Sequence, residues 1–212
     1  MKGIERRGLV QARAGVKVDT RSDSGKRYVE GYAAVFYDPN DPEGTEFELW
    51  PGFRERIMPG AFDRALKEDD IRCLFNHDSG AVLGRNRSKT LELWVDSIGL
   101  GYRCWLAETT WGNNTFISIE RGDISGSSFG FELRSEESER IVRGTDVVTR
   151  ELLDVSVYDV SPVTYPAYLG TDVTILKRSL EARAAETLKL KKEIPALLAA
   201  RRARRMRMLD LA

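Results

Sequence analysis

The chain of 212 residues has one histidine, two cysteines and no long apolar segment. No stretch reaches the roughly 18 consecutive apolar residues that a membrane-spanning helix needs. The first seven residues are mostly polar or charged, so they lack the apolar core of a signal peptide. Two widely separated cysteines, Cys73 and Cys104, argue against a disulfide framework and against a cysteine-rich zinc site. We therefore expect a protein that works in a cytoplasm with reduced, buried thiols.

Residues 28–175 consist mainly of short segments rich in aromatic and β-branched residues, separated by glycine, proline and aspartate, a pattern typical of strands. About seven or eight strands with few helices indicate a mainly β fold (α+β), a barrel or a sandwich with decorating helices. Residues 1–27 are basic and polar and form an N-terminal segment, partly flexible, with one early strand around 16–18. We predict strands at 28–36, 46–50, 71–75, 90–96, 100–107, 125–133, 147–155 and 156–163, with short helical patterns at 63–67 and 115–121.

Charge is balanced over the whole chain but not along it. Lysine plus arginine and aspartate plus glutamate both total 33, whereas the residues from Leu176 onward include 11 basic and 4 acidic ones, a net charge of +7. Leucine and alanine recur at four-residue steps there until Pro195 interrupts them, which predicts a broken helical tail over 176–212. Three roles stay open for this tail: nucleic-acid binding, docking to an acidic scaffold or capsid surface, and an exposed helix without a partner.

One stretch, Gly122–Phe131, combines three serines and three glycines with an apolar strand pattern. A serine hydroxyl is a weak nucleophile until a base takes its proton, and an imidazole with a pKa near ~6.5 suits that task. His77 is the only histidine, so serine–histidine chemistry requires the segment around His77 to lie beside the serine strand. The predicted strand 71–75 ends just before His77, where the scaffold fixes the backbone and the side chain stays reachable.

The segment Gly126–Gly130 also matches the G-x-S-x-G pattern of the α/β-hydrolase nucleophile elbow, with Ser128 at its centre. In those hydrolases the histidine follows both the serine and the acid along the chain. Here His77 precedes Ser128, and no later histidine exists. The chain order histidine, serine, acid therefore excludes that fold and requires another one.

A set of short motifs carries a family resemblance through its order and spacing. The motifs are GYAAVF at 31–36, MPGAF at 58–62, FNHD at 75–78 followed by LGR at 83–85, SGSSFGF at 125–131 and DVSPVTYPA at 159–167. With these motifs, the sequence resembles the phage prohead (capsid maturation) proteases of the HK97 type, which are related in fold to the herpesvirus assemblins. The resemblance covers residues 28–175, which we interpret as the serine protease domain.

The resemblance implies which residues are catalytic. In that family the histidine of the Asn-His-Asp motif and the serine before Phe-Gly-Phe form the catalytic pair, which corresponds to His77 and Ser128. The third member is usually acidic, in a Glu-Val-Ser segment, and Asp159 holds that position here. Ser127 stays open as the alternative nucleophile, because the family's usual motif has a single serine flanked by methionine. Asp154 stays open as the alternative acid, because aspartate is one methylene shorter than the usual glutamate.

The resemblance also implies a closed or nearly closed β-barrel of about seven strands and an acyl-enzyme mechanism that needs no cofactor or metal. The expected substrates are the major capsid protein or the scaffold protein, and then the enzyme itself, inside the assembling prohead in the host cytoplasm. A homodimer is compatible with this setting, whereas nucleic acid and membranes are not expected partners. The tail would deliver the enzyme to its substrate. Two rival hypotheses are a non-enzymatic assembly or scaffolding factor and an unrelated serine hydrolase.

Overall fold

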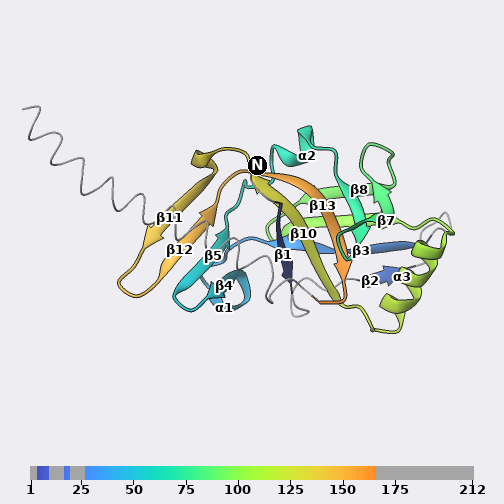
Figure 1. Cartoon of the computed structure of the whole chain (residues 1–212), viewed down its shortest axis with the longest axis horizontal. Coiled ribbons are helices and arrows are strands. Elements are labelled where there is room, and N and C mark those ends of the chain that lie inside the picture. The colour runs from blue at the N-terminus through green and yellow to red at the C-terminus, as the bar shows by residue number, and fades with distance from the viewer. Residues whose placement is uncertain (1–3, 10–16, 20–26, 166–212) are drawn as a thin grey trace, which may run out of the picture. The chain divides into compact units, whose positions relative to one another are not determined.

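The computed structural model describes residues 4–9, 17–19 and 27–165, in which strands predominate (Figure 1). Aromatic, β-branched and alternating apolar residues favour this conformation. The described strands are β1 Glu5–Leu9, β2 Lys17–Asp19, β3 Tyr28–Val35, β4 Glu46–Trp50, β5 Phe53–Ile57, β6 Arg72–Phe75, β7 Asp78–Arg85, β8 Leu91–Val95, β9 Gly99–Trp105, β10 Gly126–Leu133, β11 Glu139–Arg143, β12 Val148–Leu152 and β13 Val155–Val163. The described helices are α1 Pro42–Thr45, α2 Ala65–Glu68, α3 Thr110–Glu120 and a 3₁₀ turn at Glu136–Ser138.

The described strands form three sheets. A five-stranded sheet has the order β1-β10-β13-β6-β7, and two four-stranded sheets have the orders β11-β12-β5-β4 and β2-β3-β9-β8. Among the described residues, no pairing joins the two end strands of any sheet. The mainly β class with few helices is therefore confirmed, whereas the closed or nearly closed barrel is not.

The five-stranded sheet brings together segments that are far apart in the sequence. β10 and β13 pair antiparallel along their whole length (Figure 1). Ser128 lies opposite Ser161, and Gly130 lies opposite Asp159. On its other side β13 pairs parallel with β6, which continues into β7 as an antiparallel hairpin. The serine strand, the strand with Asp159 and the hairpin that contains His77 are thus neighbours in one sheet.

The core lies between this sheet and the sheet that contains β9. Gly84 of β7 is packed so closely against β9 that a Cβ atom there would overlap the sulfur of Cys104. Cys73 and Cys104 are free and fully buried, as expected from the sequence, and burial raises the pKa of the Cys73 thiol. On β10, the rings of Phe129 and Phe131 also face the core, so one face of the serine strand is apolar.

Most of the predicted elements are confirmed within one to three residues at their ends. β3, β4, β6, β8, β9, β10, β12 and β13 correspond to the eight predicted strands, and β2 corresponds to the early strand. α3 begins five residues earlier than predicted and ends at Glu120, one residue before the predicted end. Gly122, expected to cap the helix, follows two residues later, and its φ of +80° suits glycine. The predicted tail at 176–212 lies outside the described residues.

Four strands were not predicted: β1, β5, β7 and β11. β1, β5 and β11 are rich in arginine and glutamate rather than in the β-branched and aromatic residues that are enriched in strands, so the local pattern did not indicate strands there. β7 follows β6 after only two residues and contains two glycines, which made it look like a loop. Among the described helices, none is long and apolar enough to cross a membrane.

Phe62 anchors the serine strand to the core. Its ring is fully buried and meets Phe129 of β10 edge to face, with centroids 5.5 Å apart. Phe62→Ala should therefore lower the free energy of unfolding by about 3–5 kcal/mol, because it opens a cavity beside β10. Urea denaturation followed by circular dichroism measures this change. Ile98→Ala, at a side chain that is 43% exposed, is the control and should change stability by less than about 0.5 kcal/mol; equal losses would contradict the anchoring role.

Candidate active site

The turn between β6 and β7 holds His77. Phe75 pairs with Asp78, so only Asn76 and His77 connect the two strands. Both have positive φ, +51° and +58°, which is the backbone of a type I′ hairpin turn. Asparagine and histidine enter this left-handed region more readily than most residues other than glycine. The two-residue turn explains why a loop-like Asn-His pair can hold an imidazole in a fixed place.

Asn76 fastens this turn to the end of β13. Its backbone N–H donates to the Pro162 carbonyl at 3.1 Å, and its side-chain oxygen accepts from the Thr164 N–H at 2.8 Å. The side-chain NH₂ donates in turn to Thr164 Oγ1 at 3.1 Å. These bonds hold the hairpin beside the strand that contains Asp159. Asn76 was part of the sequence motif but had no predicted role, because its partners are 86 and 88 residues away in the sequence.

His77 connects Ser128 to Asp159 through its two ring nitrogens. Nε2 lies 2.7 Å from Ser128 Oγ, and Nδ1 lies 2.5 Å from Asp159 Oδ1. A carboxylate can only accept, so Nδ1 carries the proton and Nε2 presents its lone pair to the serine hydroxyl. The His77 and Asp159 side chains are each 8% exposed, and Ser128 is fully buried. The arrangement can move a proton from Ser128 to His77 in a largely water-free environment.

The Asp159 carboxylate has two further neighbours on the same face of the sheet. Ser161, two residues further along β13, donates its hydroxyl to Asp159 Oδ1 at 2.6 Å. Gly130, opposite Asp159 on β10, leaves room for Oδ2, because a Cβ atom at this position would overlap that oxygen. Ser161 was not predicted, although its i+2 spacing from Asp159 on a strand placed it on the same face.

The structure separates both alternative residues from His77. Ser127 points to the other face of β10, where its hydroxyl donates to the Tyr102 hydroxyl at 3.0 Å. Asp154 pairs with Arg64 at 3.1 Å and with Arg134 at 3.3 Å. Of the predicted site residues, the structure thus brings together His77, Ser128 and Asp159. Within the described part of the chain, no group of three or more histidine, cysteine, aspartate or glutamate side chains could hold a metal ion.

Comparisons with known proteins identify the family of the chain. The family described as caudovirus prohead serine protease matches residues 15–186. The chain belongs to this family. It is therefore a serine peptidase of phage capsid maturation, as the sequence motifs indicated. The solved structure of the bacteriophage T4 capsid assembly protease, gp21, is similar over 76% of this chain and 96% of its own length, with 11% identity and a TM-score of 0.46. No curated protein matches the chain.

Gly130 should be essential for the position of Asp159. In Gly130→Ala the added methyl group would push the carboxylate away from His77, so the downfield NMR resonance of the imidazole Nδ1 proton should be lost while the fold persists. Gly44→Ala is a matched control, because a methyl group there would overlap the Asp41 carboxylate of the α1 segment instead. If the resonance survives in Gly130→Ala as it does in the control, Gly130 does not position Asp159.

Proposed function

We propose that this prohead protease hydrolyses peptide bonds with Ser128 as nucleophile, His77 as general base and acid, and Asp159 as the residue that orients the imidazole. The observation that carries the proposal is the continuous hydrogen-bonded chain from Ser128 Oγ through both His77 nitrogens to Asp159. Its order and tautomer are those needed to deprotonate a serine hydroxyl. The burial of all three side chains strengthens the electrostatic interactions between them.

In the first half of the reaction, Ser128 Oγ attacks the scissile carbonyl carbon while His77 Nε2 takes the hydroxyl proton. The resulting imidazolium is stabilised by the Asp159 carboxylate, which also accepts a hydrogen bond from the Ser161 hydroxyl. The tetrahedral intermediate collapses when the peptide C–N bond breaks and His77 gives its proton to the leaving amine. Water then enters, His77 deprotonates it, and the acyl-enzyme is hydrolysed.

The proposed substrates follow from the family. A protease of the prohead acts where scaffold and capsid proteins are packed together, so we propose the scaffold protein or a scaffold-like arm of the major capsid protein as the substrate, followed by the enzyme itself. The proposed place of action is the interior of the assembling prohead. The basic tail from Leu176 onward is proposed to hold the enzyme there through electrostatic attraction to an acidic partner.

The nucleophile and the base should act as a unit. Ser128→Ala and His77→Ala should each lower kcat/KM by at least ~10³-fold, and the double variant should be little worse than either. Cleavage of the cognate capsid or scaffold protein, followed by gel electrophoresis and mass spectrometry, measures this loss. Ser127→Ala is the matched control, because it removes the neighbouring hydroxyl from the opposite face of β10. If Ser127→Ala were inactive and Ser128→Ala active, the assignment of the nucleophile would be wrong by one residue.

A pair of matched variants tests whether Asp159 orients the imidazole or only contributes negative charge. Asp159→Asn should retain the fold but favour the wrong imidazole tautomer, with a loss of kcat on the order of 10²–10⁴-fold. Asp154→Asn removes the same charge from a carboxylate that pairs with Arg64 and Arg134, and it should change kcat by less than about threefold. Steady-state kinetics on one peptide compares the two. Equal, small effects would show that no carboxylate orients His77.

A further inference from the structure

The N-terminal strand β1 lies directly beside the proposed nucleophile. It pairs antiparallel with β10, with Gly8 opposite Ser128 and Arg7 opposite Phe129. Ser128 Oγ donates to the carbonyl oxygen of Arg7 at 2.7 Å, the same distance as that to His77 Nε2. A serine hydroxyl has one proton, so the Arg7 carbonyl competes with His77 for it. The peptide bond between Arg7 and Gly8 is therefore the one nearest to the nucleophile along β1. β1 lies outside the region that matches the family, which begins at residue 15.

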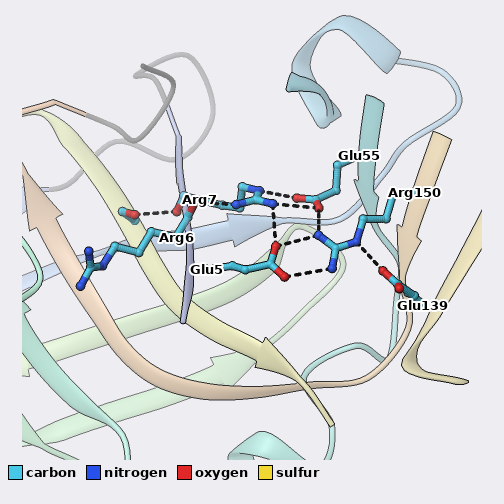
Figure 2. Close-up of polar contacts among 7 residues, drawn as sticks. Glu5, Arg6, Arg7, Glu55, Glu139 and Arg150 are labelled. Atoms are coloured by element: carbon cyan, nitrogen blue, oxygen red, sulfur yellow. Dashed lines mark hydrogen bonds and ion pairs between the residues drawn. The ribbon is translucent and has the colours of Figure 1, made fainter. Parts of the chain in front are cut away.

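The side chain of Arg7 fills a buried acidic site. Its guanidinium contacts both carboxylate oxygens of Glu55: Nε pairs with Oε1, and Nη2 donates to Oε2 at 3.0 Å (Figure 2). Glu55 lies on β5, in another sheet, and is fully buried. Burial alone would lower the pKa of Arg7, but the charge and hydrogen bonds of Glu55, together with the charge of Glu5, outweigh burial, so this pKa is raised and the guanidinium stays charged.

Glu55 is held in place independently of β1. Arg150 lies opposite Glu55 in the parallel pairing of β12 with β5 and donates to Glu55 Oε2 at 2.8 Å. Its Nε donates to Glu139 Oε2 at 2.6 Å (Figure 2). Without β1, the Arg150 guanidinium is shared between the carboxylates of Glu55 and Glu139. A buried carboxylate is costly without close cationic partners, and the guanidinium of Arg7 gives the fully buried Glu55 a second one.

The other residues of β1 follow the alternation of an extended strand. Glu5 points to the same side as Arg7, and its two carboxylate oxygens accept from Arg150 at 2.7 and 3.0 Å. Arg6, between them, points away from the cluster (Figure 2). The site therefore contacts alternate residues of an extended segment, with main-chain pairing along β10. This is how a protein binds an added peptide strand.

We propose that β1 occupies the position of a bound substrate strand, and that Glu55 selects an arginine immediately before the scissile bond. Arg150 adds a preference for glutamate two residues earlier. The substrate class is then an extended peptide with the pattern Glu-x-Arg followed by a small residue. This inference rests on the proposed function, because it needs Ser128 to be the nucleophile.

The enzyme's own Arg7–Gly8 bond is one such substrate. The Arg7 peptide must turn so that its carbonyl carbon faces Ser128 Oγ. Then the bond between Oγ and that carbon forms, His77 takes the hydroxyl proton, the C–N bond to Gly8 breaks, and His77 returns the proton to the Gly8 amine. Water hydrolyses the ester and releases residues 1–7 with a free Arg7 carboxylate. Before this cleavage β1 covers the site, which agrees with the full burial of Ser128.

The sequence contains this pattern three times: at Glu5–Gly8, Glu132–Ser135 and Glu181–Ala184. The second lies at the end of β10, where Arg134 is held by Asp69 at 2.8 Å and the strand is paired within the sheet, so it is protected. The third lies in the basic tail, outside the described residues. Cleavage after Arg183 would separate most of that tail from the protease domain.

The proposed preference for arginine is measured on peptides that differ only in the residue immediately before the scissile bond. With the full-length protein, a peptide containing Glu-Ala-Arg-Ala should be cleaved with a kcat/KM about 100-fold higher than the matched peptides with leucine or glutamate in place of arginine, because only arginine pairs with the buried Glu55. Glu55→Gln should remove most of this preference, so that the arginine and leucine peptides are cleaved with similar kcat/KM values. Mass spectrometry of the unmodified chain should detect loss of residues 1–7, which Ser128→Ala should abolish.

A second variant keeps the inference testable if Glu55→Gln does not fold. Arg7→Leu leaves Glu55 and Arg150 in place and removes the anchor of β1, so a fluorophosphonate probe should label Ser128 at least about tenfold faster than in uncleaved wild-type protein. Arg6→Leu, at the side chain that points away from the cluster, is the matched control and should label as wild type does. If β1 were only a structural strand, Arg7→Leu would be less stable and would label no faster.

The outcomes separate this inference from the function on which it rests. Cleavage of all peptides without preference for arginine, or unchanged labelling of Arg7→Leu, would overturn the role of β1 and Glu55 and leave the protease assignment intact. Failure to cleave any peptide, together with no labelling of Ser128, would overturn both. Preference for arginine that disappears in Glu55→Gln, together with faster labelling of Arg7→Leu, would establish the proposed subsite.

Discussion

The register between β10 and β13 is the constraint on which the candidate site depends. Ser128 lies opposite Ser161 and Gly130 opposite Asp159, so the two strands place a hydroxyl and a carboxylate on one face of the sheet, with space between them. On the other face of β10, the rings of Phe129 and Phe131 fill the core. A slip of one residue would exchange these faces and bury Ser128 among apolar side chains. The same burial that stabilises the fold therefore fixes the direction of the proposed nucleophile.

His77 lies at the same face of the sheet but belongs to a turn and not to a strand. His77 is in neither β10 nor β13 but in the tight turn after β6, which pairs with β13 only over Asp159 and Val160. Positive φ at two consecutive residues other than glycine is unfavourable, and such strain persists where the surroundings enforce it. Here the hydrogen bonds of Asn76 to the end of β13 supply that support. The imidazole is thus oriented by the backbone and by Asp159 together.

The buried charges between the sheets link the site to its proposed substrate. A cluster of Glu5, Arg7, Glu55, Glu139 and Arg150 is a costly way to stabilise a core, because each charge must be removed from water. The proposed release of β1 explains this cost, because one of the two guanidinium groups, that of Arg7, then belongs to a segment that binds and later dissociates. In that case the same contacts that hold β1 over Ser128 in the intact chain would hold a capsid or scaffold segment after β1 is released.

The sequence by itself determined the family, most strands and the identity of the one available base. A single histidine and the chain order of His77, Ser128 and Asp159 excluded the nucleophile elbow, and alternating apolar residues located β10 and β13. It left Ser127 open as the nucleophile and Asp154 open as the acid, because a sequence does not show which side chains lie beside His77. The expected barrel is not confirmed, since the described strands form three sheets without a closing pairing. Only the tertiary structure placed Ser128 and Asp159 beside His77 and revealed the contacts among β1, Glu55 and Arg150. A strand rich in charged residues has the sequence pattern of an exposed loop. The partners of Glu55 lie 48 and 95 residues away, and only long-range strand pairing, which no local pattern encodes, brings them together.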